Sequence, residues 1–174
     1  MTSHRVPTAL LIVISAALAS CGDPAGPTVQ NDLVFQRANG TIITFPPTTY
    51  VWCGAWEEGE VPAPSVHVFV GSAQSGWKLT GVRADIALNQ PIPFPNTFIW
   101  DAPERADLFI HDPPNELSTQ SGDSSGSVTF TKLDCSTGGE VEFTINAVVG
   151  SEFGDLPPVS VSGAFSGRVG ARPF

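Results

Sequence analysis

The stretch "EVEFTINAVV", residues 140–149, decides the fold of this chain because its apolar residues recur at every second position. Side chains alternate between the two faces of a β-strand, so a period of two places one kind of residue on each face. The positions between them are mostly polar, with Glu142, Thr144 and Asn146. The pattern predicts a strand whose buried face carries Val141, Phe143, Ile145, Ala147 and Val149.

A second run, "VSVSGAFSGRV" at residues 159–169, repeats this alternation. The two runs are separated by "SEFGDLPP", in which Gly154, Pro157 and Pro158 would interrupt a hydrogen-bonded ladder. We therefore predict that residues 140–149 and 159–169 pair as a long antiparallel hairpin at the centre of the fold.

Shorter runs of the same kind predict further strands. In "LVFQRANGTIITF", residues 33–45, the dipeptide Asn39-Gly40 predicts a β-hairpin with a type I′ turn. The apolar phase shifts across Gly81 and Val82, which indicates a β-bulge. The prolines of "NQPIPFPN", residues 89–96, predict a stiff loop or an edge strand. The remaining strands are expected around residues 50–55, 66–70, 77–86, 97–101, 107–111 and 128–135.

The number and length of these strands indicate an all-β fold. The best helical candidate after residue 21 is residues 101–108, which would form one or two turns. Eight or nine short strands divided by turn residues fit a two-sheet antiparallel β-sandwich, with a β-barrel as the alternative. The size of the chain is that of one domain, which we expect to span residues 32–174.

The N-terminal stretch "ALLIVISAALASCGD", residues 9–23, is an apolar run that stops at a cysteine. The apolar part, residues 9–19, is about half of the roughly 20 residues that a helix needs to cross a bilayer. It follows a short positive segment that contains Arg5. A short apolar run after a positive segment is typical of a cleaved export signal, so we expect a removable signal helix here.

Leu18-Ala19-Ser20-Cys21 resembles the lipobox of bacterial lipoproteins, in which an aliphatic residue and two small residues precede a cysteine. The resemblance implies that residues 1–20 are a signal peptide, that Cys21 is lipidated, and that the lipid holds the chain on a membrane. Residues 21–31 would then be the lipidated cysteine and a flexible tether. In lipoproteins of this kind an aspartate directly after the cysteine often retains the protein in the inner membrane, so Gly22 at that position implies, by the same resemblance, the outer membrane over the inner membrane.

Loss of residues 1–20 would leave a mature chain with Cys53 and Cys135 as its other cysteines. Disulfides persist in exported proteins, so we expect these two residues to be bonded. The bond would close a long loop, for which the chain-entropy estimate is about 4 to 5 kcal/mol.

The charge of the chain limits its partners. The sequence has 17 acidic residues against 8 basic ones, which gives a formal net charge of −9. Such a surface repels nucleic acid and anionic lipid headgroups. We expect no nucleic-acid partner.

A serine motif and two histidines are the candidates for catalysis. "GDSSG", residues 122–126, matches the G-x-S-x-G pattern around Ser124, but a β run rather than a helix follows it, so a hairpin loop is the favoured interpretation. His67 and His111 stand within or at the end of expected strands, where an ordinary structural role is favoured. We expect no catalytic residue among the three.

Acidic and aromatic residues are the candidates for ligand sites. The acidic groups lack a known metal-loop spacing, so we expect no metal ion and no cofactor. Tryptophans could stack on a sugar from a sheet face, but a core role is favoured. The acidic groups are residues 57–60, 101–107 and 152–155, and the tryptophans are Trp52, Trp56, Trp77 and Trp100.

These features predict the cellular location of the protein more clearly than its activity. We expect a cell-envelope lipoprotein whose exported β-domain has a binding or structural role and meets an envelope protein, a glycan or a small ligand through loops at one end. The alternative is a secreted hydrolase, or a glycan-binding module, that acts through the same loops.

Overall fold

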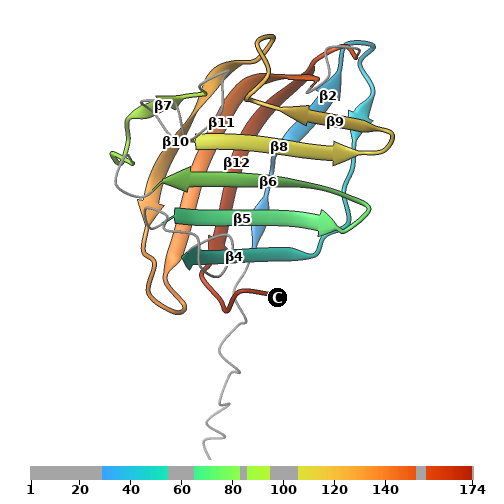
Figure 1. Cartoon of the computed structure of the whole chain (residues 1–174). Helices are drawn as coiled ribbons and strands as arrows, with labels where there is room; N and C mark the ends of the chain where they lie inside the picture. The colour runs from blue at the N-terminus through green and yellow to red at the C-terminus, as the bar shows by residue number, and fades with distance from the viewer. Residues whose placement is uncertain (1–28, 55–64, 83–85, 95–105, 152–155, 174) are drawn as a thin grey trace, which may run out of the picture.

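The computed structural model describes residues 29–54, 65–82, 86–94, 106–151 and 156–173, which form twelve antiparallel strands (Figure 1). None of the described segments forms a helix with the length and apolar character of a membrane span. The strands are β1 (Gln30–Asn31), β2 (Val34–Arg37), β3 (Ile42–Ile43), β4 (Thr49–Gly54), β5 (Ser65–Ser72), β6 (Ser75–Val82), β7 (Pro91–Pro93), β8 (Ala106–Asp112), β9 (Asn115–Ser118), β10 (Ser125–Leu133), β11 (Glu140–Ser151) and β12 (Val159–Arg168).

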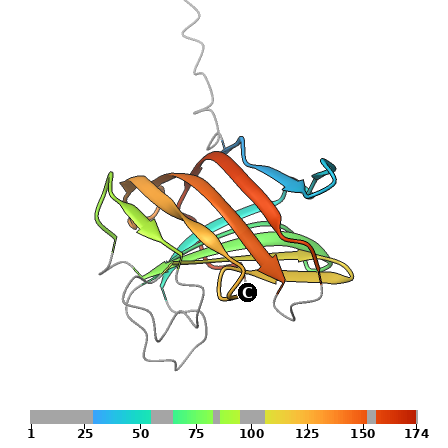
Figure 2. The same cartoon turned by 90° about the horizontal axis from the view of Figure 1, so that it is seen from above.

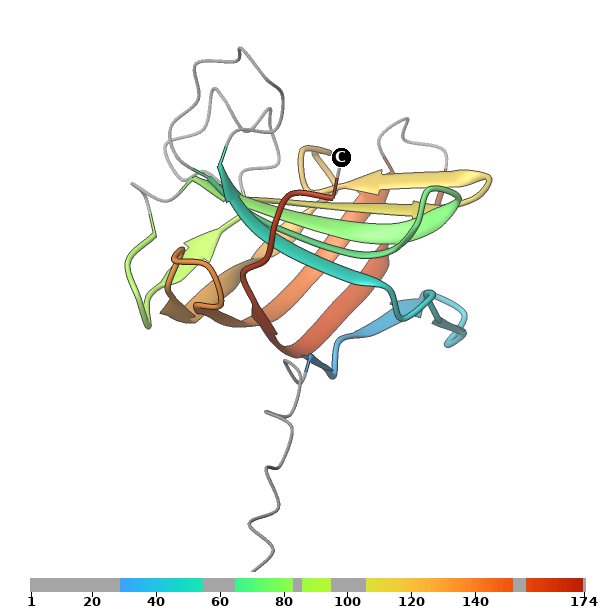
Figure 3. The same ribbon diagram turned by 90° about the horizontal axis from the view of Figure 1, so that it is seen from below.

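The strands form one sheet that curls strongly on itself, so that its two parts lie face to face (Figures 2 and 3). We call β4, β5, β6, β8 and β9 the meander arm, because each of these five strands pairs with the following one of the five, β7 belonging to the other arm. The hairpin arm contains β11 and β12 with β1, β2, β3, β7 and β10 around them. In Figure 1 the strands of the meander arm cross in front of the hairpin arm.

The predicted central hairpin is confirmed. β11 pairs with β12 from Glu140↔Arg168 to Val149↔Val159, and the five apolar positions of β11 are at most 5% exposed. The last two residues of β11, Gly150 and Ser151, pair with β9 instead. One strand therefore belongs to both arms, and the structure confirms an all-β antiparallel fold without confirming two separate sheets.

Aromatic side chains fill the space between the arms. Trp77 of the meander arm lies 5.9 Å from the ring of Phe35 and 5.8 Å from the ring of Phe165, both on the hairpin arm. Phe143 stacks on Phe165 with centroids 5.0 Å apart, and Phe130 follows Phe143 at 5.5 Å. Burial of such large rings is the main force that holds the arms together.

One end of the sheet, β4, approaches the chain that follows β12. Gly170 donates its N–H to the Val51 carbonyl at 2.8 Å. A Cβ on Gly167 would lie 3.0 Å from Val51 Cγ2 and 2.9 Å from the Phe165 ring, so only glycine permits this approach. The curled sheet, which we call the half-barrel, is therefore nearly closed where β4 meets the chain after β12. We call this line of contact the seam.

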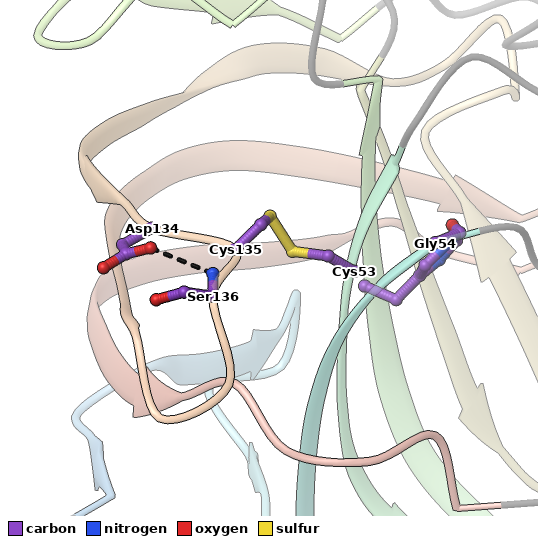
Figure 4. Close-up of a disulfide and its surroundings, with 6 residues drawn as sticks. Cys53, Gly54, Asp134, Cys135 and Ser136 are labelled. Carbon is purple, nitrogen blue, oxygen red and sulfur yellow. Dashed lines mark hydrogen bonds between the residues drawn. A yellow bond between two sulfur atoms is a disulfide. The ribbon is translucent and has the colours of Figure 1, made fainter.

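Cys53 and Cys135 lie at disulfide distance on the same seam, as the sequence predicts (Figure 4). Their Cα atoms are 5.7 Å apart, within the usual range for a disulfide. Cys53 comes from the end of β4 and Cys135 from the turn between β10 and β11, so the pair links the two arms. In that turn the Ser136 N–H donates to Asp134 Oδ1 at 2.9 Å and holds the pKa of the carboxyl below its ordinary value.

Two local predictions differ from the structure. The β2–β3 hairpin exists, but only Gly40 of its turn has a positive φ, +85°, whereas a type I′ turn needs two such residues. The ladder between β5 and β6 has no register shift near Gly81, and the bulge lies instead in β10, between Phe130 and Lys132. The apparent phase shift arises because β6 ends at Val82 and Ile86 folds back over Gly81 from outside the strand.

Other boundaries shift by a few residues. β1 begins at Gln30, inside the expected tether, and pairs with β12. β8 begins at Ala106, so the described end of the helical candidate at residues 101–108 is strand. The proline-rich segment does form an edge, because β7 pairs only with β10. The expected strand at residues 97–101, the residues of the signal peptide and Cys21 lie outside the described residues.

Because β11 has one buried face and one outward face, substitutions on the two faces should change the stability by very different amounts. Phe143→Asp would bury a charge among the aromatic rings and should lower the free energy of unfolding by at least about 3 kcal/mol. Glu142→Gln, on the other face, should change it by no more than about 0.5 kcal/mol. Urea denaturation of both variants measures the difference, and equal shifts of the midpoint would contradict the assignment of the faces.

Candidate ligand-binding site

A pocket of about 250 Å³ opens between the arms at one end of the half-barrel. Three connections meet there: the β2–β3 turn, the β8–β9 turn and the chain that leads into β12. We call it the mouth pocket, and its lining residues are Arg37, Ala38, Asn39, Asp112, Asn115, Leu117, Leu156, Pro157 and Val159.

The wall of the mouth pocket is apolar. Leu117 and Val159 belong to the core and are at most 3% exposed, whereas Leu156 at the rim is 38% exposed. Pro157 completes this side. The pocket thus offers apolar surface that continues from the hydrophobic core to solvent.

The opposite side of the mouth pocket is polar and nearly neutral. Arg37 of the hairpin arm forms an ion pair with Asp112 of the meander arm. Asn39 and Asn115 add two amide side chains. Arginine supplies only donors and a carboxylate only acceptors, so the rim can satisfy a ligand that carries both. Pockets of this kind, mostly apolar with a few convergent polar groups, are typical of small-molecule sites.

Turn geometry fixes the position of Arg37. Gly40 donates its N–H to the Arg37 carbonyl at 2.8 Å, and Arg37 donates its own N–H to the Thr41 carbonyl at 2.9 Å. The Thr41 N–H in turn donates to Asn39 Oδ1 at 3.0 Å. The hairpin turn therefore holds the guanidinium at the mouth.

His67, a candidate base in the sequence, is a buried structural residue on the outer face of the meander arm. Its ring stacks on Trp52 with centroids 4.8 Å apart. Nε2 lies 3.0 Å from the Gly54 carbonyl, which can only accept, so Nε2 carries the proton and Nδ1 accepts from Thr80 Oγ1 at 3.3 Å. Burial, aided by the charges of Lys78 and Arg172, lowers the pKa of His67 to about 4. The ring is neutral near pH 7.

His111 and Asp107 are placed on the same outer face by β8. His111 Nδ1 lies 3.4 Å from Glu116 Oε1 on β9. Asp107 is 6% exposed and accepts hydrogen bonds from three side chains that follow it in the fold, those of Ser118, Thr119 and Gln120. Buried carboxylates need such donors, so Asp107 has a structural explanation.

Ser124 holds the corner where β11 changes arms. Its hydroxyl donates to the Ser118 carbonyl at 2.9 Å and accepts from the Gly150 N–H at 2.9 Å. The residue is 4% exposed. Because both hydrogen bonds go to backbone groups of paired strands, the G-x-S-x-G motif here is a structural bridge.

The other sequence candidates divide into two groups. Trp52 and Trp77 are buried, at 2% and 1% exposure, although Trp52 packs on the outer face and not between the arms. Trp56 and Trp100, with nearly all of the acidic groups, lie outside the described residues. Within the part of the chain that the structure covers, no three His, Cys, Asp or Glu side chains gather as metal ligands.

Sequence reasoning did not select the residues of the mouth pocket. The sequence nevertheless marks the turns that line this pocket, because "RANG", "HDPP" and "DLPP" are three turn motifs. Only the curled topology brings these three turns to one place. Comparison of the chain with protein-family models, curated proteins and solved structures finds no match.

The lowered pKa of His67 predicts a loss of stability in acid. Below about pH 6.5 an unfolded chain binds a proton at this ring that the folded chain excludes until about pH 4. Stability should therefore be unaffected by His67 above pH 7 and should fall by up to about 3 kcal/mol between pH 6.5 and pH 4.

Urea denaturation of the native protein and of His67→Gln across this pH range tests the prediction. The variant should lose most of the additional acid sensitivity, and His111→Gln should keep it because His67 is still present. Identical pH dependence of the native protein and His67→Gln would contradict the assignment.

Proposed function

We propose that the chain is an exported, lipid-anchored module of the bacterial cell envelope that binds a small neutral ligand in its mouth pocket. The ligand class that fits the lining is a saccharide unit, because a sugar carries hydroxyl donors and acceptors together with apolar C–H surface. The observation that carries the proposal is the convergence of three turns into one pocket with an apolar wall and a paired Arg37–Asp112 rim.

The position of β1 supports a pocket that faces away from the membrane. Gln30 and Asn31 pair with Ser166 and Phe165, near the end of β12. Val159, in the mouth pocket, lies at the other end of the same strand. At about 3.3 Å per residue, the distance along β12 from Ser166 to Val159 is about 23 Å. A tether that enters at β1 would leave the mouth accessible from the envelope.

The packing of the arms supports the architecture that this proposal needs. The arms enclose one core, as the two sheets of a sandwich do, and the seam from Cys53 to Gly170 fastens one side. We propose that the domain works as a β-sandwich that is open at the mouth. Binding through end loops is then the use that this architecture favours.

The lipid anchor predicts a dependence on Cys21. In cells fed radiolabelled palmitate, the native protein should carry label and sediment with membranes, because two or three acyl chains hold a protein on a bilayer. Cys21→Ser should lose the label and retain residues 1–20. Undiminished label on the variant would contradict lipidation at Cys21.

Ligand-observed NMR with envelope-type disaccharides tests the mouth pocket. We expect chitobiose to show saturation transfer from the mature protein, and Ala38→Trp to weaken its affinity at least about tenfold by filling the mouth. Thr144→Trp, which places the same side chain on the exposed face of β11, is the matched control and should retain the native affinity. Equal affinities of the two variants would show that the mouth is not the site.

A further inference from the structure

We propose that the outer face of the hairpin arm carries a second binding site, for a hydroxylated organic ammonium ion such as an amino sugar. The site is a depression of about 240 Å³ on the side of β11 and β12 that faces away from the meander arm (Figure 2). We call it the outer pocket. Its lining residues are Gln30, Thr131, Glu142, Phe143, Thr144, Ala164, Phe165 and Ser166.

Strand register brings the polar groups of the outer pocket together. Glu142 on β11 pairs with Ser166 on β12, which pairs in turn with Gln30 on β1, so three strands contribute to one row. Thr144, the next outward residue of β11, pairs with Ala164. Because alanine has only a methyl group, it leaves space on the sheet surface beside the Glu142 carboxylate.

The β-bulge of β10 adds a hydroxyl to this pocket. At the register shift, two residues of β10, Thr131 and Lys132, lie opposite the single residue Glu142. Both β10 residues are exposed, and Thr131 lines the pocket. Thr131, Thr144 and Ser166 therefore supply three hydroxyls near the carboxylate, each of which can donate and accept hydrogen bonds.

Glu142 is a half-buried carboxylate that is open to a cation from outside the chain. Within the described residues it accepts no hydrogen bond and forms no ion pair. The Lys132 ammonium contacts Glu140 instead, as does the Arg168 guanidinium. The Glu140 hydrogen bond is the main cause that raises the pKa of Lys132, and the charge of Glu142 adds a weaker effect. The cations on the neighbouring strands therefore neutralise Glu140 and leave the Glu142 carboxylate to a ligand.

The charges around the outer pocket favour a cation. Asp32 places a second carboxylate nearby, since its N–H donates to the Ala164 carbonyl at 2.9 Å and its Oδ2 accepts from Gln30 Nε2 at 2.6 Å. None of the described lining residues is basic. An ammonium ion beside Glu142 would form charge-assisted hydrogen bonds, and hydroxyls next to the ammonium would find the hydroxyl groups of the lining.

The outer pocket is separate from the mouth pocket and has a different chemistry. The two share no lining residue. Val159 of the mouth and Ser166 of the outer pocket are about 23 Å apart along β12. The mouth has an apolar wall and a neutral ion pair, whereas the outer pocket has a carboxylate among hydroxyls. The inference rests on neither the proposed saccharide site nor the lipid anchor.

Glucosamine in its ammonium form and glucose, which share a ring but differ in charge, are the probes for the outer pocket. Saturation-transfer NMR of the mature protein should detect glucosamine, with an affinity at least about tenfold above that of glucose. Thr144→Trp should abolish glucosamine binding by filling the pocket. Glu142→Gln should weaken it at least about tenfold while leaving the stability of the fold nearly unchanged.

Two controls match these variants. Ala38→Trp fills the mouth pocket, and Glu116→Gln removes a carboxylate from the meander arm; both should bind glucosamine within about twofold of the native protein. Chitobiose in its neutral, N-acetylated form should still bind to Thr144→Trp in the mouth. A loss of glucosamine binding alone therefore separates the outer pocket from the proposed saccharide site.

Thermal unfolding of each variant establishes that it is folded. Equal binding of glucosamine to native protein and Thr144→Trp, an undiminished affinity of Glu142→Gln, equal affinity for both probes, or no glucosamine signal from the native protein would overturn the proposal.

Discussion

The rest of the structure depends on β11, which among the described strands is the one that hydrogen-bonds in both arms. Its first ten residues pair with β12, and Gly150 and Ser151 pair with β9. A sheet that shares a strand in this way must curl, because both arms have to bury apolar faces of their own. The Ser124 hydroxyl donates to the Ser118 carbonyl and accepts from the Gly150 N–H. It therefore satisfies two buried backbone groups at the point where β11 changes its pairing partner.

In the curled sheet the two arms are joined along the seam and are open at the end that holds the mouth pocket. The Gly170–Val51 hydrogen bond and the Cys53–Cys135 pair hold the seam near the start of β11. At the far end of the β11–β12 hairpin, the arms are joined by the Arg37–Asp112 ion pair. This partly buried ion pair is a single polar contact between the arms, whereas the seam has both the Cys53–Cys135 pair and a backbone hydrogen bond, so this end is the one that a ligand can enter most easily.

Sequence reasoning located what depends on local pattern and missed what depends on topology. Val141 to Val149 and Val159 to Val169 have an unbroken period of two, so their pairing and their buried face were predictable. The curl was not, because β11 carries no sequence mark at Gly150 that separates a corner from a strand end. The mouth pocket was missed for the same reason: Arg37, Asp112 and Leu156 stand in unrelated turns until the arms fold together.

The meander arm differs from the hairpin arm on its outward face, and this difference explains why its strands were harder to read. Outward residues of the hairpin arm, such as Thr144 and Ser162, are small, polar and exposed. Outward residues of the meander arm include Trp52 and His67, each only 2% exposed, so the outward face is buried at these positions of β4 and β5 and the alternation of polar and apolar residues is weaker there. Polar groups that are desolvated in this way need partners, which Asp107 finds in Ser118, Thr119 and Gln120, and His67 in Thr80 and the Gly54 carbonyl. The same burial that obscures the strand pattern therefore requires the side-chain hydrogen bonds that tie β5 to β6 and β8 to the chain after β9.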